Sequence, residues 1–125
     1  MTEAPTDGRT VGLIAVGGAI GTSVRYAISQ GAPVAIGTFP TTTLVINIVG
    51  AFILGLLLGA LGRHRLADTT LRPLIGIGFL GGFTTFSTFA VQTSRLSTAR
   101  RLRYVALSVG GGITLAAAGL ALAAT

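Results

Sequence analysis

Long apolar runs separated by short polar segments form the main pattern along this chain. Four windows of mostly apolar residues, at 11–28, 43–61, 74–91 and 104–124, are each long enough to cross the hydrocarbon core of a membrane as a helix. The prolines and most of the arginines lie outside these windows. The pattern predicts an all-α membrane protein in which four transmembrane helices form a single domain over residues 1–125.

The amino-acid composition agrees with a membrane protein and argues against a soluble one. Half of the residues are hydrophobic, 10% are charged, and the mean hydropathy is +0.80, whereas soluble domains carry about 25% charged residues. The net charge of +6 comes from nine arginines, which would contact phospholipid headgroups between the apolar segments. We therefore expect a lipid bilayer, and not nucleic acid, as the partner of these arginines.

The short connections leave no room for a soluble domain, so we expect the function to lie within the membrane. Small residues recur every four positions, as in Gly17 with Gly21 and in Gly55 with Gly59. This spacing predicts faces on which helices pack closely. The chain contains no cysteine, which excludes disulfides and thiolate metal sites.

The arginines are divided almost evenly between the two sides of the membrane. Four spans put both termini and the 62–73 loop on one side, where the arginines are Arg9, Arg63, Arg65 and Arg72. The other side has Arg95, Arg100, Arg101 and Arg103, with Arg25 near the end of its helix. Because Lys/Arg bias sets orientation, we predict dual topology and an antiparallel homodimer. The alternative is that the insertion machinery or a partner fixes one orientation.

The polar residues within the spans are hydrogen-bond donors without negative charge. No Asp or Glu lies in any span, although a proton- or cation-coupled carrier usually needs an intramembrane carboxylate. Hydroxyl and amide groups can replace the hydration shell of a small anion. Asn47 is the best candidate, with Thr43 on the same helix face. The alternative is that Asn47 only bonds another helix.

The third span contains a segment that is poorly suited to a continuous helix. Gly81-Gly82 and the β-branched pair Thr84-Thr85 are weak helix formers, which predicts a break in mid-membrane. A break frees backbone carbonyls that can hold a cation such as Na⁺. The alternative is a continuous helix whose glycines allow close packing.

Two further groups have both a functional and an ordinary interpretation. Phe86 and Phe89 lie on one helix face, where the positive edges of their rings could contact an anion weakly; the alternative is that they pack or face lipid. Arg25 could attract anions into a vestibule, or its side chain could extend to the membrane interface.

Three segments resemble the Fluc (CrcB) family of fluoride channels. They are residues 81–89 (GGFTTFSTF), residues 18–26 (GAIGTSVRY) and residues 43–50 (TLVINIVG). The first motif is specific, and the likeness covers nearly the whole chain. The resemblance implies a passive fluoride channel rather than an enzyme, which exports cytoplasmic fluoride across the plasma membrane of a prokaryote. It also implies an antiparallel dimer with two pores and a central structural Na⁺.

The resemblance also implies roles for individual residues. Asn47 would be the pore amide, Phe86 and Phe89 the aromatic pair along the ion path, and Arg25 a vestibule residue. The remaining pore residues would be Ser87, Thr88, Thr43 and Ser108. The carbonyls of Gly81 and Thr84 would hold the Na⁺. Members of this family often line the pore with several polar residues on the fourth helix. Here Gly112 and Ala116 follow Ser108 at the next helical steps, so Ser108 is the one polar residue carried over from this helix.

Other functions remain open at this point. A small multidrug/proton antiporter has a similar architecture, but it needs a membrane-embedded glutamate that this chain lacks. A structural membrane subunit without transport would use the same hydroxyls for helix packing. Some Fluc proteins pair two different chains, so a heterodimer with a paralogous subunit is an alternative to the homodimer.

Overall fold

The computed structural model describes residues 7–62 and 65–124, with backbone alone for 65–67. Arg63, which the sequence placed among the arginines of one membrane side, lies outside the described residues, as does His64. Within the described part, every regular element is a helix. In chain order these are α1 (Gly8–Gly31), α2 (Thr41–Leu61), α3 (Arg65–Leu71), the π-helix η1 (Arg72–Leu80), α4 (Gly81–Phe83), α5 (Phe86–Ser94) and α6 (Thr98–Ala124).

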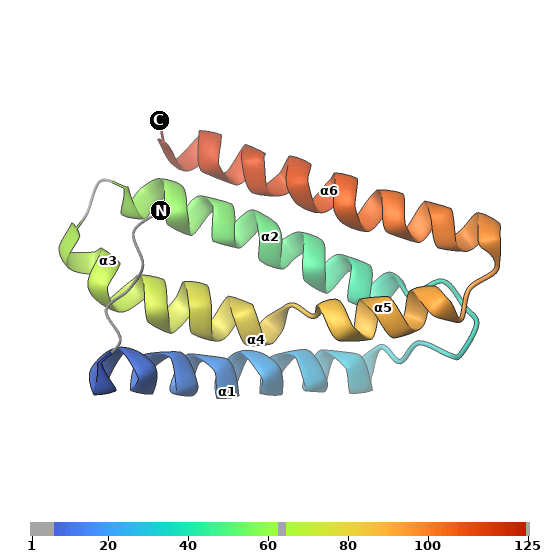
Figure 1. Ribbon diagram of the computed structural model, residues 1–125, viewed down its shortest axis with the longest axis horizontal. Coiled ribbons are helices and arrows are strands. Elements are labelled where there is room, and N and C mark those ends of the chain that lie inside the picture. Colours follow the sequence, from blue (N-terminus) through green and yellow to red (C-terminus); the bar gives the residue numbers. More distant parts are fainter. Residues whose placement is uncertain (1–6, 63–64, 125) are drawn as a thin grey trace.

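The elements form four rods that lie side by side (Figure 1). In chain order the rods are α1, α2, the succession of α3, η1, α4 and α5, which we call the third rod, and α6. The start of α1 and the end of α6 lie at one end of the bundle, together with α3. The α1–α2 loop and the α5–α6 turn lie at the other end (Figure 1).

Among the described residues, four segments are long and apolar enough to span a membrane, which confirms the predicted number of helices. They are Gly8–Gly31, Thr41–Leu61, Asp68–Ser94 and Thr98–Ala124. Each is longer than the apolar window that predicted it; α6, for example, begins at Thr98 and not at Tyr104. Arginine is a good helix former, and its long side chain can reach water or headgroups from inside a helix. The helix therefore continues through residues that hydropathy alone assigns to a loop.

The third rod changes its winding twice along its length. The π-helix η1 has Pro73 in its first turn and passes directly into the three residues of α4. Thr84 and Thr85 then have extended backbone, with φ/ψ of −83°/158° and −147°/123°. The Thr85 hydroxyl accepts a hydrogen bond from the Thr88 N–H at 3.2 Å, so that Thr85 forms the N-cap of α5.

Glycines bring α1 and the third rod into direct backbone contact. A Cβ on Gly78 would lie 2.8 Å from the carbonyl oxygen of Ile14, and one on Gly82 would lie 2.5 Å from that of Gly18. Added Cβ atoms on Gly17 and Gly21 would overlap the carbonyl oxygens of the third rod. Such close approach supplies the van der Waals contact that drives helix association in lipid.

Glycines also bring α2 and α6 into direct backbone contact. A Cβ on Gly119 would lie 2.5 Å from the Phe52 carbonyl oxygen, and one on Gly59 would lie 2.8 Å from that of Leu120. A Cβ on Gly55 would overlap the Ala116 carbonyl oxygen. The glycine faces predicted from the four-residue spacing are thus confirmed for both helix pairs.

The α1 glycines provide a stability test with an internal control. Gly21→Ala forces a methyl group into the Phe79 carbonyl and should lower the free energy of unfolding by about 1–3 kcal/mol. Gly12 is on the same helix but has nothing within 4 Å of an added Cβ. Gly12→Ala should therefore be neutral or stabilising by up to about 1 kcal/mol, because alanine is the better helix former.

Thermal unfolding in detergent, followed by circular dichroism, compares the two variants. Equal melting temperatures for Gly21→Ala and Gly12→Ala would contradict the close packing of α1 on the third rod.

Candidate functional site

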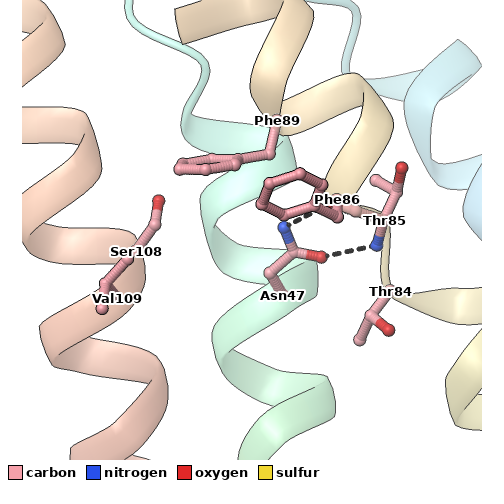
Figure 2. Close-up of a pocket in the computed structure, with 7 residues that line it drawn as sticks. All are labelled: Asn47, Thr84, Thr85, Phe86, Phe89, Ser108 and Val109. Carbon is pink, nitrogen blue, oxygen red and sulfur yellow. Dashed lines mark hydrogen bonds between the residues drawn. The ribbon is translucent and has the colours of Figure 1, made fainter.

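A pocket of about 280 Å³ lies between α2, α5 and α6, beside the extended residues that join α4 to α5. Figure 2 shows the seven residues around it. They are Asn47, Thr84, Thr85, Phe86, Phe89, Ser108 and Val109. Four residues that the sequence suggested for an ion path, Asn47, Phe86, Phe89 and Ser108, therefore line one cavity although they come from three helices.

Asn47 joins α2 to the backbone of the extended segment by two hydrogen bonds. Its Nδ2 donates to the Thr85 carbonyl oxygen at 3.0 Å, and its Oδ1 accepts from the Thr85 N–H at 2.9 Å (Figure 2). The pairing fixes the orientation of the amide, since the reverse orientation would oppose two donors and two acceptors. Within the described residues Nδ2 makes only this bond, so one amide hydrogen remains for a ligand.

The two phenylalanines form a tilted pair at the start of α5. Their ring centroids are 5.8 Å apart with an interplanar angle of 48°. Phe86 is 78% exposed. Phe89 is half-buried and packs against the ring of Tyr104, with the two ring centroids 5.0 Å apart. Both rings lie on the same side of the Asn47 amide (Figure 2). An aromatic edge carries partial positive charge, so rings in this position can contact an anion that lies beside the amide.

Ser108 contributes a hydroxyl group that the protein does not satisfy. Its Oγ is buried and has no hydrogen-bond partner among the described residues, and it points into the space between α6 and the two rings (Figure 2). A buried polar group without a partner costs about 1–3 kcal/mol. Because the atom lines the pocket, a hydrogen-bonding occupant of the pocket would remove that cost.

Three of the predicted pore residues lie outside the pocket lining. Thr43 is buried on α2, one turn before Asn47, and interacts with the hydroxyl of Tyr104. Ser87 and Thr88 lie in the first turn of α5. The Ser87 hydroxyl is 3.4 Å from the Thr85 hydroxyl, and the Thr88 N–H is bonded to the same atom.

Tyr104 is the main neighbour that the sequence interpretation missed. Its side chain is fully buried, and its hydroxyl donates to Gln92 Oε1 at 3.1 Å. It packs against Phe89 and lies one helical turn before Ser108 on the same face of α6. This four-residue spacing was the available signal. It was overlooked because Tyr104 falls at the edge of the apolar window.

Arg25 contacts the third rod and not the pocket. Its Nε donates to the Gly82 carbonyl oxygen at 3.1 Å, and Thr22 Oγ1 reaches the same oxygen at 3.4 Å. The guanidinium is thus bonded to backbone at the end of α4 through Nε, and its side chain is half-buried. The interruption of the third rod receives donors from α1 on this side and from Asn47 on the other.

The carbonyls suggested for a cation are left without donors. The Leu80, Gly82 and Thr85 carbonyl oxygens accept hydrogen bonds from Thr84, Arg25 and Asn47 respectively. Within residues 7–62 and 65–124, no hydrogen-bond donor is recorded for the carbonyls of Gly81 or Thr84. Gly81 is exposed, and no atom lies within 4 Å of an added Cβ. Uncharged backbone oxygens of this kind suit a hard cation such as Na⁺.

Comparison with known proteins gives a consistent result over most of the chain. The family model described as "CrcB-like protein, Camphor Resistance (CrcB)" matches residues 12–120. The protein "Fluoride-specific ion channel FluC 2" of Leifsonia xyli subsp. xyli is 44% identical over 124 residues, which cover 94% of this chain and 77% of that protein. "Fluoride-specific ion channel FluC" of Vibrio vulnificus is 42% identical over 106 residues, with 84% of each chain covered.

A further relative, "Fluoride-specific ion channel FluC 3" of Streptomyces avermitilis, is 44% identical over 112 residues. The match covers 88% of this chain and 55% of that longer protein. All three relatives are named as ion channels and not as enzymes. The chain therefore belongs to the CrcB-like protein family.

Proposed function

We propose that this protein is a passive fluoride channel that lets cytoplasmic fluoride leave a prokaryotic cell across its plasma membrane. The observation that carries the proposal is the pocket between α2, α5 and α6, which combines an amide, a hydroxyl without a partner and two aromatic rings. None of its seven lining residues is charged. The names of the relatives support fluoride as the ion.

The chemistry of the pocket suits a small anion that has lost its water. The free amide hydrogen of Asn47 and the hydroxyl of Ser108 donate hydrogen bonds, and the ring edges of Phe86 and Phe89 add weak electrostatic attraction. These groups compensate the loss of hydration without a fixed positive charge that would hold the ion too tightly. Conduction needs this balance, since an ion must leave a site as readily as it enters.

The other predicted residues, together with Tyr104, extend this path. Thr43 and Tyr104 supply hydroxyls one turn away from Asn47 and Ser108, toward the α5–α6 end of the bundle. Ser87 and Thr88 supply the polar first turn of α5. Arg25 acts through its charge at the end of α4 and raises the local concentration of anions in a vestibule.

The interruption at residues 84–85 lies, in this proposal, near mid-membrane at the centre of an antiparallel homodimer with two pores. Non-helical backbone at that depth must be buried in protein or line a cavity. The exposed Gly81 and its carbonyl leave space for a second copy, and the Gly81 and Thr84 carbonyls of both copies would hold a structural Na⁺. A paralogous chain in place of the second copy would give a heterodimer.

Fluoride flux through the chain alone is the first prediction. Purified protein in liposomes loaded with fluoride should release fluoride much faster than protein-free liposomes, and it should release little chloride under the same gradient. A fluoride electrode measures the efflux after the membrane potential is cancelled with a potassium ionophore. If correctly folded protein released fluoride no faster than protein-free liposomes, the proposed channel function would be wrong.

Ser108→Ala separates a role in flux from a role in stability. Ser108 Oγ has no partner in the described protein, so its removal should leave the melting temperature unchanged or slightly raised. Fluoride efflux should fall about tenfold, because a hydrogen bond to a charged group is worth about 1.5–3 kcal/mol. Asn47 is a less clean choice, since its substitution also releases Thr85.

The matched control is Ser94→Ala, which removes a hydroxyl bonded to the Val91 carbonyl of its own helix and away from the pocket. Its fluoride efflux should equal that of the unchanged protein. Equal flux through Ser108→Ala and Ser94→Ala would exclude Ser108 from the ion path.

Gly81→Cys tests the dimer and its cation together. The chain has no cysteine, so this variant carries one thiol at the proposed centre. Oxidation, or a short bifunctional thiol reagent, should link two copies, because disulfides need Cα atoms within about 7 Å. The yield of linked dimer in sodium should exceed the yield in N-methylglucamine, measured by gel electrophoresis. A Gly110→Cys variant, also open on its helix, controls for random collision; equal yields in the two variants would contradict the arrangement.

A further inference from the structure

One end of the bundle is strongly basic and has no acidic residue among those that the structure describes. Arg95, Arg100, Arg101 and Arg103 lie within nine residues of each other, around the α5–α6 turn. The three acidic residues of the chain are Glu3, Asp7 and Asp68. Asp7 caps the start of α1, and Asp68 in α3 pairs with Arg72 at 2.7 Å. The start of α1 and α3 both lie at the opposite end of the bundle (Figure 1). The four arginines are therefore not neutralised by any carboxylate of the described chain.

Two of these arginines hold the protein together, and two are free. Arg100 Nη1 donates to the Gly37 carbonyl of the α1–α2 loop at 3.2 Å. Arg101 donates to the carbonyls of Thr93 and Leu96, at 3.2 Å each, at the end of α5. Arg95 and Arg103 are exposed, and their guanidinium groups make no hydrogen bond or ion pair with the described residues. Their guanidinium groups are available to a partner.

Exposed apolar side chains accompany the arginines. Ile36, next to Gly37 in the α1–α2 loop, is 80% exposed, and Leu102 between the arginines is 65% exposed. Gly37 has a positive φ of 83°, and its carbonyl is the one that Arg100 binds. An apolar loop tip that Arg100 holds at the same end of the bundle as the unpaired guanidinium groups is suited to a surface that offers both negative charge and hydrocarbon.

The length of α6 puts this end of the bundle at the depth of the lipid headgroups. Its 27 residues extend for about 40 Å at 1.5 Å per residue, whereas the hydrocarbon core is about 30 Å thick. The surplus lies at the arginine-bearing start of the helix, because residues from Tyr104 onward are almost wholly apolar.

We propose that this basic end is a binding surface for anionic phospholipid. The lipid phosphate contacts Arg95 and Arg103, and the acyl chains cover Ile36 and Leu102. Each arginine near an anionic membrane surface adds electrostatic attraction, which falls with salt because the charges are exposed. The proposal depends on membrane insertion and not on which ion the protein conducts.

The test compares two lipids with identical acyl chains. Native mass spectrometry of the full chain in neutral detergent gives the affinities for phosphatidylglycerol and for phosphatidylcholine. The unchanged protein should prefer phosphatidylglycerol, and the double variant Arg95→Gln/Arg103→Gln should bind it about thirtyfold more weakly. Neither arginine side chain bonds the described protein, and a glutamine keeps the backbone N–H that Arg95 donates to Gln92, so the variant should keep its helicity and melting temperature.

Arg9→Gln is the matched control at the opposite end, where Arg9 donates to Thr69 and Thr70; its affinity for phosphatidylglycerol should be unchanged. Ile36→Ser should weaken the binding of both lipids, because it removes the apolar contact. Glycerol phosphate, which has the headgroup charge but no acyl chain, should not compete. Equal affinities of the unchanged protein and the double variant, or full competition by glycerol phosphate, would overturn the proposal.

Discussion

The geometry around the pocket depends on how the backbone polar groups at residues 80–85 find hydrogen-bond partners where the third rod is interrupted. Each unpaired group in hydrocarbon costs several kcal/mol. At Gly82 and Thr85 the partners are side chains of other helices: Arg25 and Thr22 from α1 on the Gly82 carbonyl, and Asn47 from α2 on both polar groups of Thr85. Two helices therefore hold one interruption from opposite sides.

The glycine contacts make this arrangement possible. Arg25 can bond to the backbone at the end of α4 through its Nε because α1 lies against the third rod with backbone touching backbone. A larger residue at Gly17 or Gly21 would move α1 outward and carry Arg25 and Thr22 away from Gly82. The close packing of α1 on the third rod and the hydrogen bonds to Gly82 therefore depend on each other. The distance between these two rods sets the geometry of the extended residues 84–85.

Much of the fold could be predicted from the sequence, because lipid imposes simple rules. Hydropathy gave the four spans, and the spacing of Gly17, Gly21, Gly55 and Gly59 gave the packing faces. The gathering of Asn47, Phe86, Phe89 and Ser108 around one pocket also agrees with the roles that the family resemblance implied. Those roles themselves, the depth of the interruption, the Na⁺ and the dimer stay predictions.

Other features could not be predicted, since they depend on which groups meet in space. Composition does not say that Asn47 pairs with Thr85 or that Arg25 bonds the Gly82 carbonyl, because several carbonyls near a helix end are equally suitable acceptors. The π-helical winding of η1 has no reliable sequence signal. Tyr104 was missed because window methods give least weight to residues at a boundary.

The π-helix η1 has a consequence for how this segment tolerates insertion and deletion. Each hydrogen-bonded turn of a π-helix encloses one residue more than a turn of an α-helix. Loss of a single residue between Arg72 and Leu80 could be absorbed by rewinding to α, but the glycines that face α1 would then rotate out of register with the extended pair 84–85. The nine residues are therefore constrained in number as well as in kind, and related chains should keep this spacing even where individual side chains differ.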